Sequence, residues 1–555
     1  MADEDIRIGV FVCHCGTNIG GVLDVPSLAE YAKTLPNVTY SADNLYTCSE
    51  VGLTEIKENI LEQKLNRVIV ASCSPRTHEP LFRSICQEAG LNPYLFEMVN
   101  IRDQDSWVHM KEPEKGTIKA KDLIRMSVHR AALLEPLERI KVSVIPSAIV
   151  IGGGIAGMTS ALNLANQRFE VSLIEKEKEL GGLLRSLNRV YPSNEEASKL
   201  LESINLIESH EKIKVYKTSL IEKIDGFIGN YKVTINQNKK IIEIDAGVIV
   251  IATGAIPLSP EGYYGYNKKN IISQLDLERV LKDDQISSNN ITMILCVGCR
   301  NEERKYCSNI CCMTAMKNAM LILEKNPNAH ITILFQDIQT SGTTYEMYYR
   351  KAREMGILFI KYLPEKPPVI KKGVVKVYSD SLNQEIEIPQ DLVVLSTPLV
   401  ANEDSDNLAK MLKVPLEENN FFLEAHVKLR PVDFATDGIF VCGSAHWPAD
   451  IAESTSQANA AASRASRILW KDTLEVEGST AEVIGELCIG CEACIKVCPY
   501  KAITKDEETD IAVVNKVVCK GCGVCGASCP KKAIIIHHST SDQIRAEIFT
   551  YGGEV

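Results

Sequence analysis

Short apolar runs alternate with amphipathic segments over the first part of the chain. Runs rich in β-branched residues, which favour strands, occur at residues 8–12, 38–42 and 66–71. Between them, two segments repeat apolar positions at helical spacing, at residues 27–35 and 52–65. Strands that alternate with helices are typical of a parallel sheet. Residues 1–140 are therefore predicted to form a parallel α/β domain.

A second α/β pattern begins near Val142 and is interrupted. It returns near Ile439 and ends in a helix that runs to about Trp470, so the intervening residues 290–398 look like an insertion. A polar stretch then precedes a compact cysteine-rich module between Glu482 and His538. The predicted limits are 1–140, 141–475 with the insertion at 290–398, and 476–540.

Composition and charge restrict the possible partners. The 555-residue chain has a net charge of -11 and a pI near 5.6, and its basic residues are scattered, which argues against a nucleic-acid surface. No apolar run approaches the roughly 20 residues of a membrane span. These features predict a cytoplasmic protein without a membrane span.

The 19 cysteines occur in short-spaced groups, with none between Cys86 and Cys296. Such spacing is typical of ligands rather than of a disulfide framework, and this number favours iron-sulfur clusters over zinc. The clearest group is the run C-x2-C-x2-C-x3-C-P, which occurs twice in the last module. Because the fourth cysteine of each run binds the other cluster in two-cluster ferredoxins, two 4Fe-4S ligand sets are predicted: Cys488, Cys491, Cys494 and Cys529, and Cys519, Cys522, Cys525 and Cys498.

A dinucleotide-binding motif begins the second α/β region. Its glycines Gly152, Gly154 and Gly157 follow a strand and open a helix, and Glu175 ends the next strand, where its carboxylate can accept a ribose hydroxyl. The segments VIVIATGAIP and ATDGIFVCGSAHWPADIAESTSQANAAA resemble later FAD-contacting segments of thioredoxin-reductase-like flavoproteins, although Ser444 stands where an acidic residue is usual. That resemblance favours FAD over NAD. Further FAD contacts are expected at Ile155, Ala156, Lys176, Gly182, Leu183, Ala252, Thr253, Gly254, Gly443, Ser444, Asp450 and Ile451.

The inserted region carries cysteines where a second glycine loop would bind NAD(P)H. The strand ITMIL is followed by five cysteines, at positions 296, 299, 307, 311 and 312, and then by a helix and another strand. A pyrophosphate would face negative sulfur there, so we expect the nicotinamide site to be lost. The thiols could ligate a further 4Fe-4S cluster, or Cys296 and Cys299 could form a redox-active dithiol. Five cysteines within 17 residues favour the cluster.

This segment is similar to that of the A subunit of heterodisulfide reductase. The family pattern maps to Cys296, Cys307, Cys311, Cys312 and Lys317, which leaves Cys299 spare, and an exchange between Cys296 and Cys299 stays open. The resemblance implies that Lys317 approaches the flavin, where its charge could stabilise the reduced form. The alternative is a lysine on a solvated helix face.

The N-terminal motifs CHCGTNIGG, YTCSEVG and ASCSPRTHEPLF resemble the same family, so the resemblance covers essentially the whole chain. Independently, cysteines that follow parallel strands share one sheet edge, so a fourth cluster is expected on Cys13, Cys15, Cys48 and Cys73. The alternative is four structural cysteines. Cys86 and Cys442 are expected to be core residues.

The resemblance implies an FAD-dependent oxidoreductase subunit that bifurcates electrons. Implied cofactors are FAD and four 4Fe-4S clusters. Implied partners are B- and C-type heterodisulfide reductase subunits, ferredoxin and a hydrogenase- or formate-dehydrogenase-linked delta subunit, with a homodimer inside the larger complex. Many family members carry an additional ferredoxin insert that this chain lacks, since residues 87–295 contain no cysteine. The alternatives are a non-bifurcating relay and a disulfide reductase that uses Cys296 and Cys299.

Overall fold

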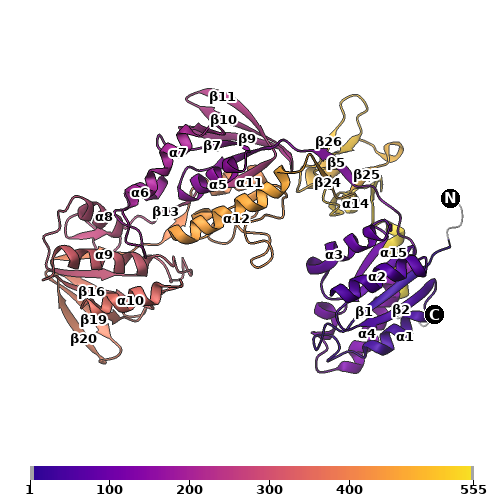
Figure 1. The fold of residues 1–555 in the computed structure, drawn as a ribbon, viewed down its shortest axis with the longest axis horizontal. Helices are drawn as coiled ribbons and strands as arrows, with labels where there is room; N and C mark the ends of the chain where they lie inside the picture. Colours follow the sequence, from indigo (N-terminus) through magenta and orange to yellow (C-terminus); the bar gives the residue numbers. More distant parts are fainter. Residues whose placement is uncertain (1–4, 552–555) are drawn as a thin grey trace. The chain divides into compact units, whose positions relative to one another are not determined.

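The structure is a computed structural model and describes residues 5–551. The chain forms two compact units (Figure 1). Unit 1 combines Met1–Lys141 with Glu475–Val555, and unit 2 is Val142–Leu474. Two short strands, β5 (Ile140–Ser143) and β24 (Thr473–Val476), contain the points where the chain passes from one unit to the other.

The N-terminal part of unit 1 is a four-stranded parallel sheet in the order β2-β1-β3-β4. Its strands are β1 (Ile8–Cys13), β2 (Val38–Asn44), β3 (Arg67–Ser72) and β4 (Phe96–Asn100). Its helices are α1 (Val25–Lys33), α2 (Glu50–Glu62), α3 (Pro75–Glu88) and α4 (Pro113–Ala131), with a π-helical turn at Arg102–Ser106. All residues of β1 and β3 are buried, as both faces of a parallel sheet are covered in such folds.

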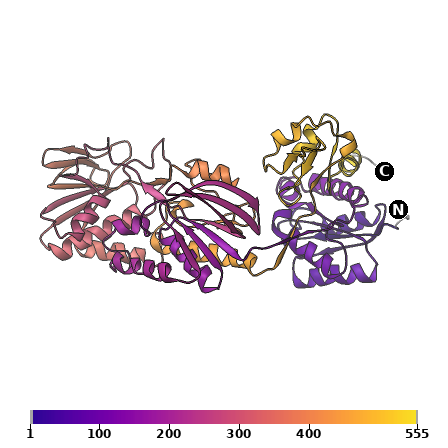
Figure 2. The ribbon, with the colours of Figure 1, turned by 90° about the horizontal axis from the view of Figure 1, so that it is seen from above.

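The C-terminal part of unit 1 consists of short elements and one final helix. They are β25 (Ala481–Val483), a 3-10 turn at Gly485–Leu487, α13 (Ala493–Val497), β26 (Ile503–Lys505), β27 (Ala512–Val514), α14 (Val524–Ser528), β28 (Ile534–Ile536) and α15 (Ser541–Thr550). Antiparallel pairs form between β25 and β28 and between β26 and β27. Helix α15 packs on α4, so this part lies against the N-terminal sheet domain (Figure 2).

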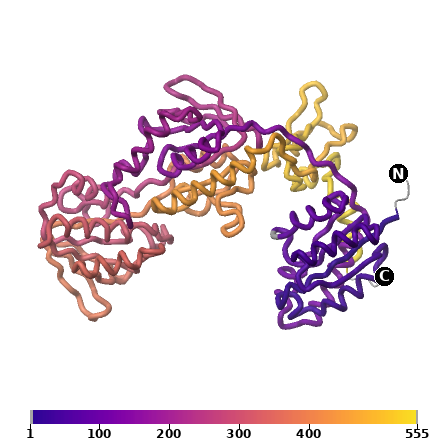
Figure 3. Tube along the Cα trace, viewed as in Figure 1, coloured from indigo at the N-terminus to yellow at the C-terminus, as the bar shows by residue number. Residues whose placement is uncertain are grey.

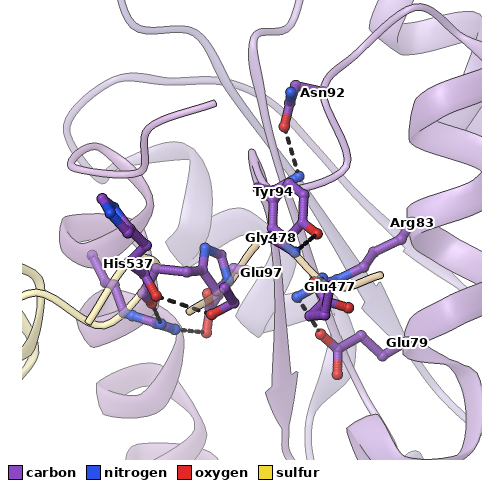
Figure 4. A network of polar contacts seen from close by, with 11 residues as sticks. Glu79, Arg83, Asn92, Tyr94, Glu97, Glu477, Gly478 and His537 are labelled. Carbon is purple, nitrogen blue, oxygen red and sulfur yellow. Dashed lines mark hydrogen bonds and ion pairs between the residues drawn. The ribbon is translucent and has the colours of Figure 1, made fainter. Parts of the chain in front are cut away.

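Polar contacts reinforce the join within unit 1 (Figure 4). The Gly478 N–H donates to the Tyr94 hydroxyl at 2.6 Å, and Arg83 pairs with Glu477 at 3.2 Å. Arg130 pairs with Glu97 and donates to the backbone carbonyl of His538 at 2.6 Å. The two ends of the sequence are therefore tied together by backbone and charged side-chain groups.

The first half of unit 2 is a five-stranded parallel sheet in the order β23-β12-β6-β7-β8, with a three-stranded antiparallel sheet beside it. The strands are β6 (Ser147–Ile151), β7 (Glu170–Ile174), β8 (Ile213–Tyr216), β9 (Ser219–Phe227), β10 (Asn230–Gln237), β11 (Lys240–Ala246), β12 (Val248–Ile251) and β23 (Ile439–Val441). The helices are α5 (Ile155–Asn166), α6 (Ala197–Leu201), α7 (Ser203–Ser209), α11 (Ser405–Leu412) and α12 (Ile451–Leu469), with 3-10 turns at Gly182–Ser186 and Gly443–Ala445. Helices α5 and α12 lie side by side (Figure 1).

The second half of unit 2 is a further parallel sheet, in the order β14-β21-β15-β16-β17. Its strands are β14 (Ile271–Ser273), β15 (Asn290–Ile294), β16 (His330–Phe335), β17 (Leu358–Lys361) and β21 (Leu392–Leu395), with the antiparallel β18 (Val369–Lys371), β19 (Val374–Ser379) and β20 (Gln384–Pro389). Its helices are α8 (Gln274–Lys282), α9 (Cys311–Lys325) and α10 (Tyr345–Glu354). The chain passes between the halves through β13 (Ala255–Pro257) and β22 (Leu399–Ala401), which pair antiparallel (Figure 3).

The predicted fold class is confirmed: a parallel α/β domain, a two-dinucleotide-domain flavoprotein fold and a ferredoxin module. The sheet of the inserted half extends beyond its expected limits, because β14 and α8 precede residue 290 and β14 pairs with β21. Strand β4, which the hydrophobic pattern did not predict, completes the N-terminal sheet.

Candidate functional site

The C-terminal module groups its cysteines into two cavities. One is lined by Cys488, Cys491, Cys494 and Cys529, and the other by Cys498, Cys519, Cys522 and Cys525. Each cavity thus contains three cysteines of one run and the fourth cysteine of the other run, as the crossed ligand assignment requires. Backbone N–H groups of Ala502 and Ala533 donate to the sulfurs of Cys498 and Cys529, both at 3.3 Å. These donor sets fit two 4Fe-4S clusters.

The N-terminal sheet brings a second kind of cysteine set together. Cys13 ends β1, Cys73 follows β3, and the Thr47 N–H next to Cys48 donates to the Cys13 sulfur at 3.4 Å. Burial raises the pKa of Cys73, and the nearby thiols of Cys15, Cys13 and Cys48 raise it further. All four predicted thiols therefore lie within electrostatic reach of one another.

Sequence reasoning missed the cation beside this set. The Arg102 side chain interacts with the Cys15 sulfur and opposes the burial that raises the pKa of Cys73. Trp107 lies under the guanidinium, 4.7 Å from its carbon to the ring centre. Among residues 5–551, no three His, Cys, Asp or Glu side chains are placed to hold a single metal ion. A cluster on these four cysteines stays a prediction.

The first βα loop of unit 2 is shaped by glycines. Gly152 has φ +107°, and a Cβ on Gly157 would lie 1.8 Å from the Gly152 carbonyl oxygen. The other predicted segments converge on this loop: a Cβ on Gly152 would contact the Ala252 carbonyl at 2.3 Å, and one on Gly443 would contact the Ala156 side chain at 2.7 Å. A Cβ on Gly182 would meet the Gly154 Cα at 3.3 Å. Four segments distant in sequence thus surround the N-terminus of α5.

This arrangement has polar groups suited to FAD. No side chain caps α5 at Gly154, whose Cβ direction is open, so the helix N-terminus can face a pyrophosphate. Glu175 accepts from the Gly153 N–H at 2.6 Å and from the Glu177 N–H at 2.8 Å, which fixes its carboxylate beside the loop. The buried Thr253 hydroxyl has no hydrogen-bond partner among the described residues. A bound nucleotide could satisfy it.

The remaining expected FAD contacts lie around this loop in several environments. Asp450 caps α12 by accepting from the Glu453 N–H at 2.8 Å, and the Ser444 hydroxyl donates to the Ala449 carbonyl at 3.2 Å. Lys176 points to Asp404, 3.2 Å away, and is engaged in an exposed ion pair. Partly or fully solvent-accessible residues of the set are Ile155, Leu183, Gly254 and Ile451.

In the second half of unit 2, all five cysteines after β15 gather at one end of the sheet. The Cys299 thiol hydrogen-bonds Cys296 and lowers the pKa of Cys296 to about 7, whereas the pKa of Cys299 is raised. Burial raises the pKa of Cys311, and Cys312, Cys296 and Cys307 raise it further. Cys296 and Cys299 both belong to this group, so the geometry leaves the choice between them as ligand open.

Two tyrosines connect the cysteine group to the last flavin segment. The Tyr345 hydroxyl pairs with the Asp450 carboxylate, and Tyr191 packs edge-to-face on Tyr345 with ring centres 5.6 Å apart. The pKa of Tyr191 is raised well above its ordinary value by burial, and then by Asp450, Tyr345 and Cys311. Tyr191 is therefore close to both the flavin segment and the cysteine group, which no sequence motif indicated.

Lys317 does not lie on a solvated helix face, which was the alternative interpretation. Its side chain is 2% exposed, its ammonium pairs with Glu278, and it donates to the Arg189 carbonyl at 2.8 Å. Glu278 is fully buried and also accepts from the Asn188 N–H at 2.9 Å. These backbone partners follow Gly182 and Leu183 by a few residues, so Lys317 reaches toward a segment expected to contact FAD. Glu278 belongs to no motif and could not be recognised from the sequence.

The thiols expected to be structural are core residues. Cys86 and Cys442 are both fully buried in hydrophobic clusters. Burial raises the pKa of each to about 12, which keeps the thiol neutral. Neither belongs to one of the four cysteine groups.

Two family models match parts of the chain. Residues 146–298 match a model described as pyridine nucleotide-disulphide oxidoreductase, and residues 487–533 match a 4Fe-4S dicluster domain. A solved thioredoxin reductase from Lactococcus lactis is 17% identical and aligns with 58% of this chain and 98% of its own, at a TM-score of 0.41. Across residues 5–551, the helices are too short or too polar to span a bilayer.

Curated relatives match almost the entire chain. A Methanopyrus kandleri protein, named as the second of two iron-sulfur A subunits of CoB--CoM heterodisulfide reductase, is 38% identical over 91% of this chain and 92% of its own. A Methanothermobacter thermautotrophicus protein, named as the A subunit of H2:CoB-CoM heterodisulfide, ferredoxin reductase, is 37% identical over 91% of each chain. Together with the flavin-type fold and the dicluster module, these matches show that the chain belongs to the A-subunit family of heterodisulfide reductases, which are oxidoreductases.

Proposed function

We propose that this chain is the flavin and iron-sulfur electron-transfer subunit of a heterodisulfide reductase-like complex, and that it bifurcates electron pairs between a disulfide acceptor and ferredoxin. The observation that carries this proposal is the connection between the two halves of unit 2. The cysteine group takes the place of a second nucleotide loop, and Tyr191 lies beside both Cys311 and Asp450. A one-electron carrier at the cysteines would therefore lie close to a two-electron carrier at the glycine loop.

The residues around α5 fit FAD, which accepts electrons in pairs and can release them singly. The open N-terminus of α5 would hold the pyrophosphate, and Glu175 would accept a ribose hydroxyl. Lys317 supplies a buried positive charge that Glu278 and the Arg189 carbonyl hold in place. A cation at this position favours the reduced, anionic form of a flavin.

We propose four 4Fe-4S clusters, each able to carry one electron. Two would be held in the C-terminal cavities, and a third at Cys13, Cys15, Cys48 and Cys73. The fourth would be held by Cys307, Cys311, Cys312 and either Cys296 or Cys299. Burial and the neighbouring thiols raise the pKa of most of these inner cysteines, so cluster binding there must release protons.

The proposed partners follow from the family. The name of the Methanothermobacter protein links it to H2, the CoB-CoM heterodisulfide and ferredoxin. For this chain we propose B- and C-type subunits, a hydrogenase- or formate-dehydrogenase-linked delta subunit, ferredoxin, and a homodimer within the complex. The alignment with the Methanopyrus protein spans 601 positions, whereas 91% of 555 residues is about 505, so that relative has insertions that this chain lacks. This supports a short form without the inserted ferredoxin domain, whose electron exit another chain would supply.

Iron per flavin in the anaerobically purified protein tests the cofactor assignment. About 16 irons per FAD are expected from four cubanes. A value near 12 would leave room for a Cys296–Cys299 dithiol without a cluster beside it, and about 8 would restrict iron to the C-terminal module. Either lower value, in protein with full FAD, would contradict the proposed electron route.

A further inference from the structure

Arg300 stands next to the inserted cysteine group and has no role in the assignments above. It directly follows Cys299, and its backbone φ of +55° turns the chain at this point. Its guanidinium donates to the Asp337 carboxylate at 2.5 Å, and Lys361 donates to the other oxygen of the same carboxylate at 3.0 Å. Asp337 also accepts the Cys312 thiol at its backbone carbonyl, at 3.8 Å. One residue therefore anchors both the arginine and a cysteine of the group.

The other side of the guanidinium faces sulfur. Its Nη1 is buried and has no hydrogen-bond partner among residues 5–551. The Arg300 side chain interacts with the Cys296 sulfur and acts electrostatically on Cys307 and Cys312. A guanidinium whose N–H groups are partly unsatisfied, held beside three thiols, can donate to thiolate or cluster sulfur.

We propose that Arg300 raises the reduction potential of the iron-sulfur cluster held by the inserted cysteine group, and so makes this cluster a better acceptor for electrons from the flavin. Reduction adds one electron to the cluster and breaks no bond, and the donor loses that electron. The added negative charge is stabilised by a cation at contact distance, and hydrogen bonds to the sulfurs act in the same direction. The proposal rests on the proposed function, because it requires a cluster at these cysteines.

The test is a redox titration of the full chain, reconstituted anaerobically and followed by electron paramagnetic resonance with dithionite as the reductant. Cys311→Ser identifies the signal of the inserted cluster. In Arg300→Gln, we expect unchanged iron content and an about tenfold lower ratio of reduced to oxidised cluster at fixed potential, which is about 59 mV for one electron. Arg300→Lys, which keeps the charge, should restore most of the ratio. Arg350→Gln is the control, because this arginine is 71% exposed on α10 and pairs only with Glu346.

Each other outcome overturns the proposal in a recognisable way. An unchanged titration in Arg300→Gln with full iron would show that the guanidinium does not act on the cluster. If both Arg300→Gln and Arg300→Met lose about four irons, Arg300 serves assembly rather than potential. If Cys311→Ser removes neither iron nor a signal, the cluster assignment itself is wrong, and the failure belongs to the proposed function.

Discussion

Unit 2 contains two βα junctions of the same topology with opposite loop chemistry. In the first, β6 leads through Gly152, Gly154 and Gly157 into α5, and in the second, β15 leads through a cysteine loop into α9. Neither helix has a side-chain N-cap, so both N-termini present free N–H groups. The first leaves open space in front of these groups, whereas the second places Cys311 and Cys312 as its first residues. The same positive helix end can serve a phosphate or thiolates, and the loop decides which.

The junctions also differ in what supports them. The glycine loop works by close backbone packing, and its main charged partner, Glu175, comes from the adjacent strand. The cysteine loop depends on side chains far away in sequence: Asp337 holds Arg300, and Glu278 holds Lys317. Substitutions should therefore act locally on FAD in the first junction and through charge in the second.

The largest effect is expected from Gly157→Ala. The new Cβ would lie 1.8 Å from the Gly152 carbonyl oxygen, a backbone atom that cannot move without displacing the loop. We expect loss of FAD with iron retained in the C-terminal module, measured as flavin and iron content of the purified chain. Gly154→Ala is the matched variant, because its Cβ contacts nothing within 4 Å, so it should fold normally and only weaken FAD binding. Full FAD content in Gly157→Ala would show that the first junction tolerates a side chain.

Removal of single thiols in the second junction should separate Cys296 from Cys299. The family pattern predicts that Cys296→Ser loses about four irons, while Cys299→Ala keeps them. Iron analysis and the visible spectrum of each variant, beside the unaltered chain, give the answer. The reverse result would make Cys299 the ligand and Cys296 its hydrogen-bonded neighbour, and loss in neither variant would exclude a cluster here.

Lys317→Met tests the charge network of α9. The substitution leaves the fully buried Glu278 without its cation, and breaking a buried pair in this way costs about 3–5 kcal/mol. The double variant Lys317→Met with Glu278→Gln should recover most of this loss, since Gln can still accept from the Asn188 N–H. Urea unfolding followed by flavin fluorescence measures the stability. The control is Lys505→Met beside Cys488, whose exposed ion pairs should contribute nothing measurable.

The same lysine variant has a second readout in the flavin. Loss of a nearby charge should lower the two-electron potential by some tens of millivolts, since about 30 mV corresponds to ~1.4 kcal/mol. Spectroelectrochemical titration of Lys317→Met and of the double variant would show this. If both keep the original flavin potential, Lys317 stabilises the fold without acting on the flavin.

The sequence alone predicted the elements and groups that depend on local pattern. The repeated cysteine run determined the two C-terminal sets, and the glycine spacing located the first junction, because each occurs in one contiguous motif. Glu278, Asp337 and Tyr191 could not be predicted, since each acts only after distant segments meet in the folded chain. Lys317 was found by family resemblance, but its burial came from the packing of α8 against α9, which residue spacing does not encode.

The smallest effect is expected from nicotinamide nucleotides, which should leave the flavin spectrum unchanged. A second nucleotide would need open N–H groups at the N-terminus of α9, but the buried Cys312 lies there together with Cys311. The only glycine of this loop, Gly298, is packed against Leu258, whose side chain a Cβ would meet at 2.6 Å, so no open cradle for a pyrophosphate forms. Anaerobic mixing with NADH or NADPH checks this, with dithionite on the same sample as the positive control. Rapid bleaching of the flavin by either nucleotide would mean that the two junctions still share a ligand class, and that the cysteines did not displace the nucleotide.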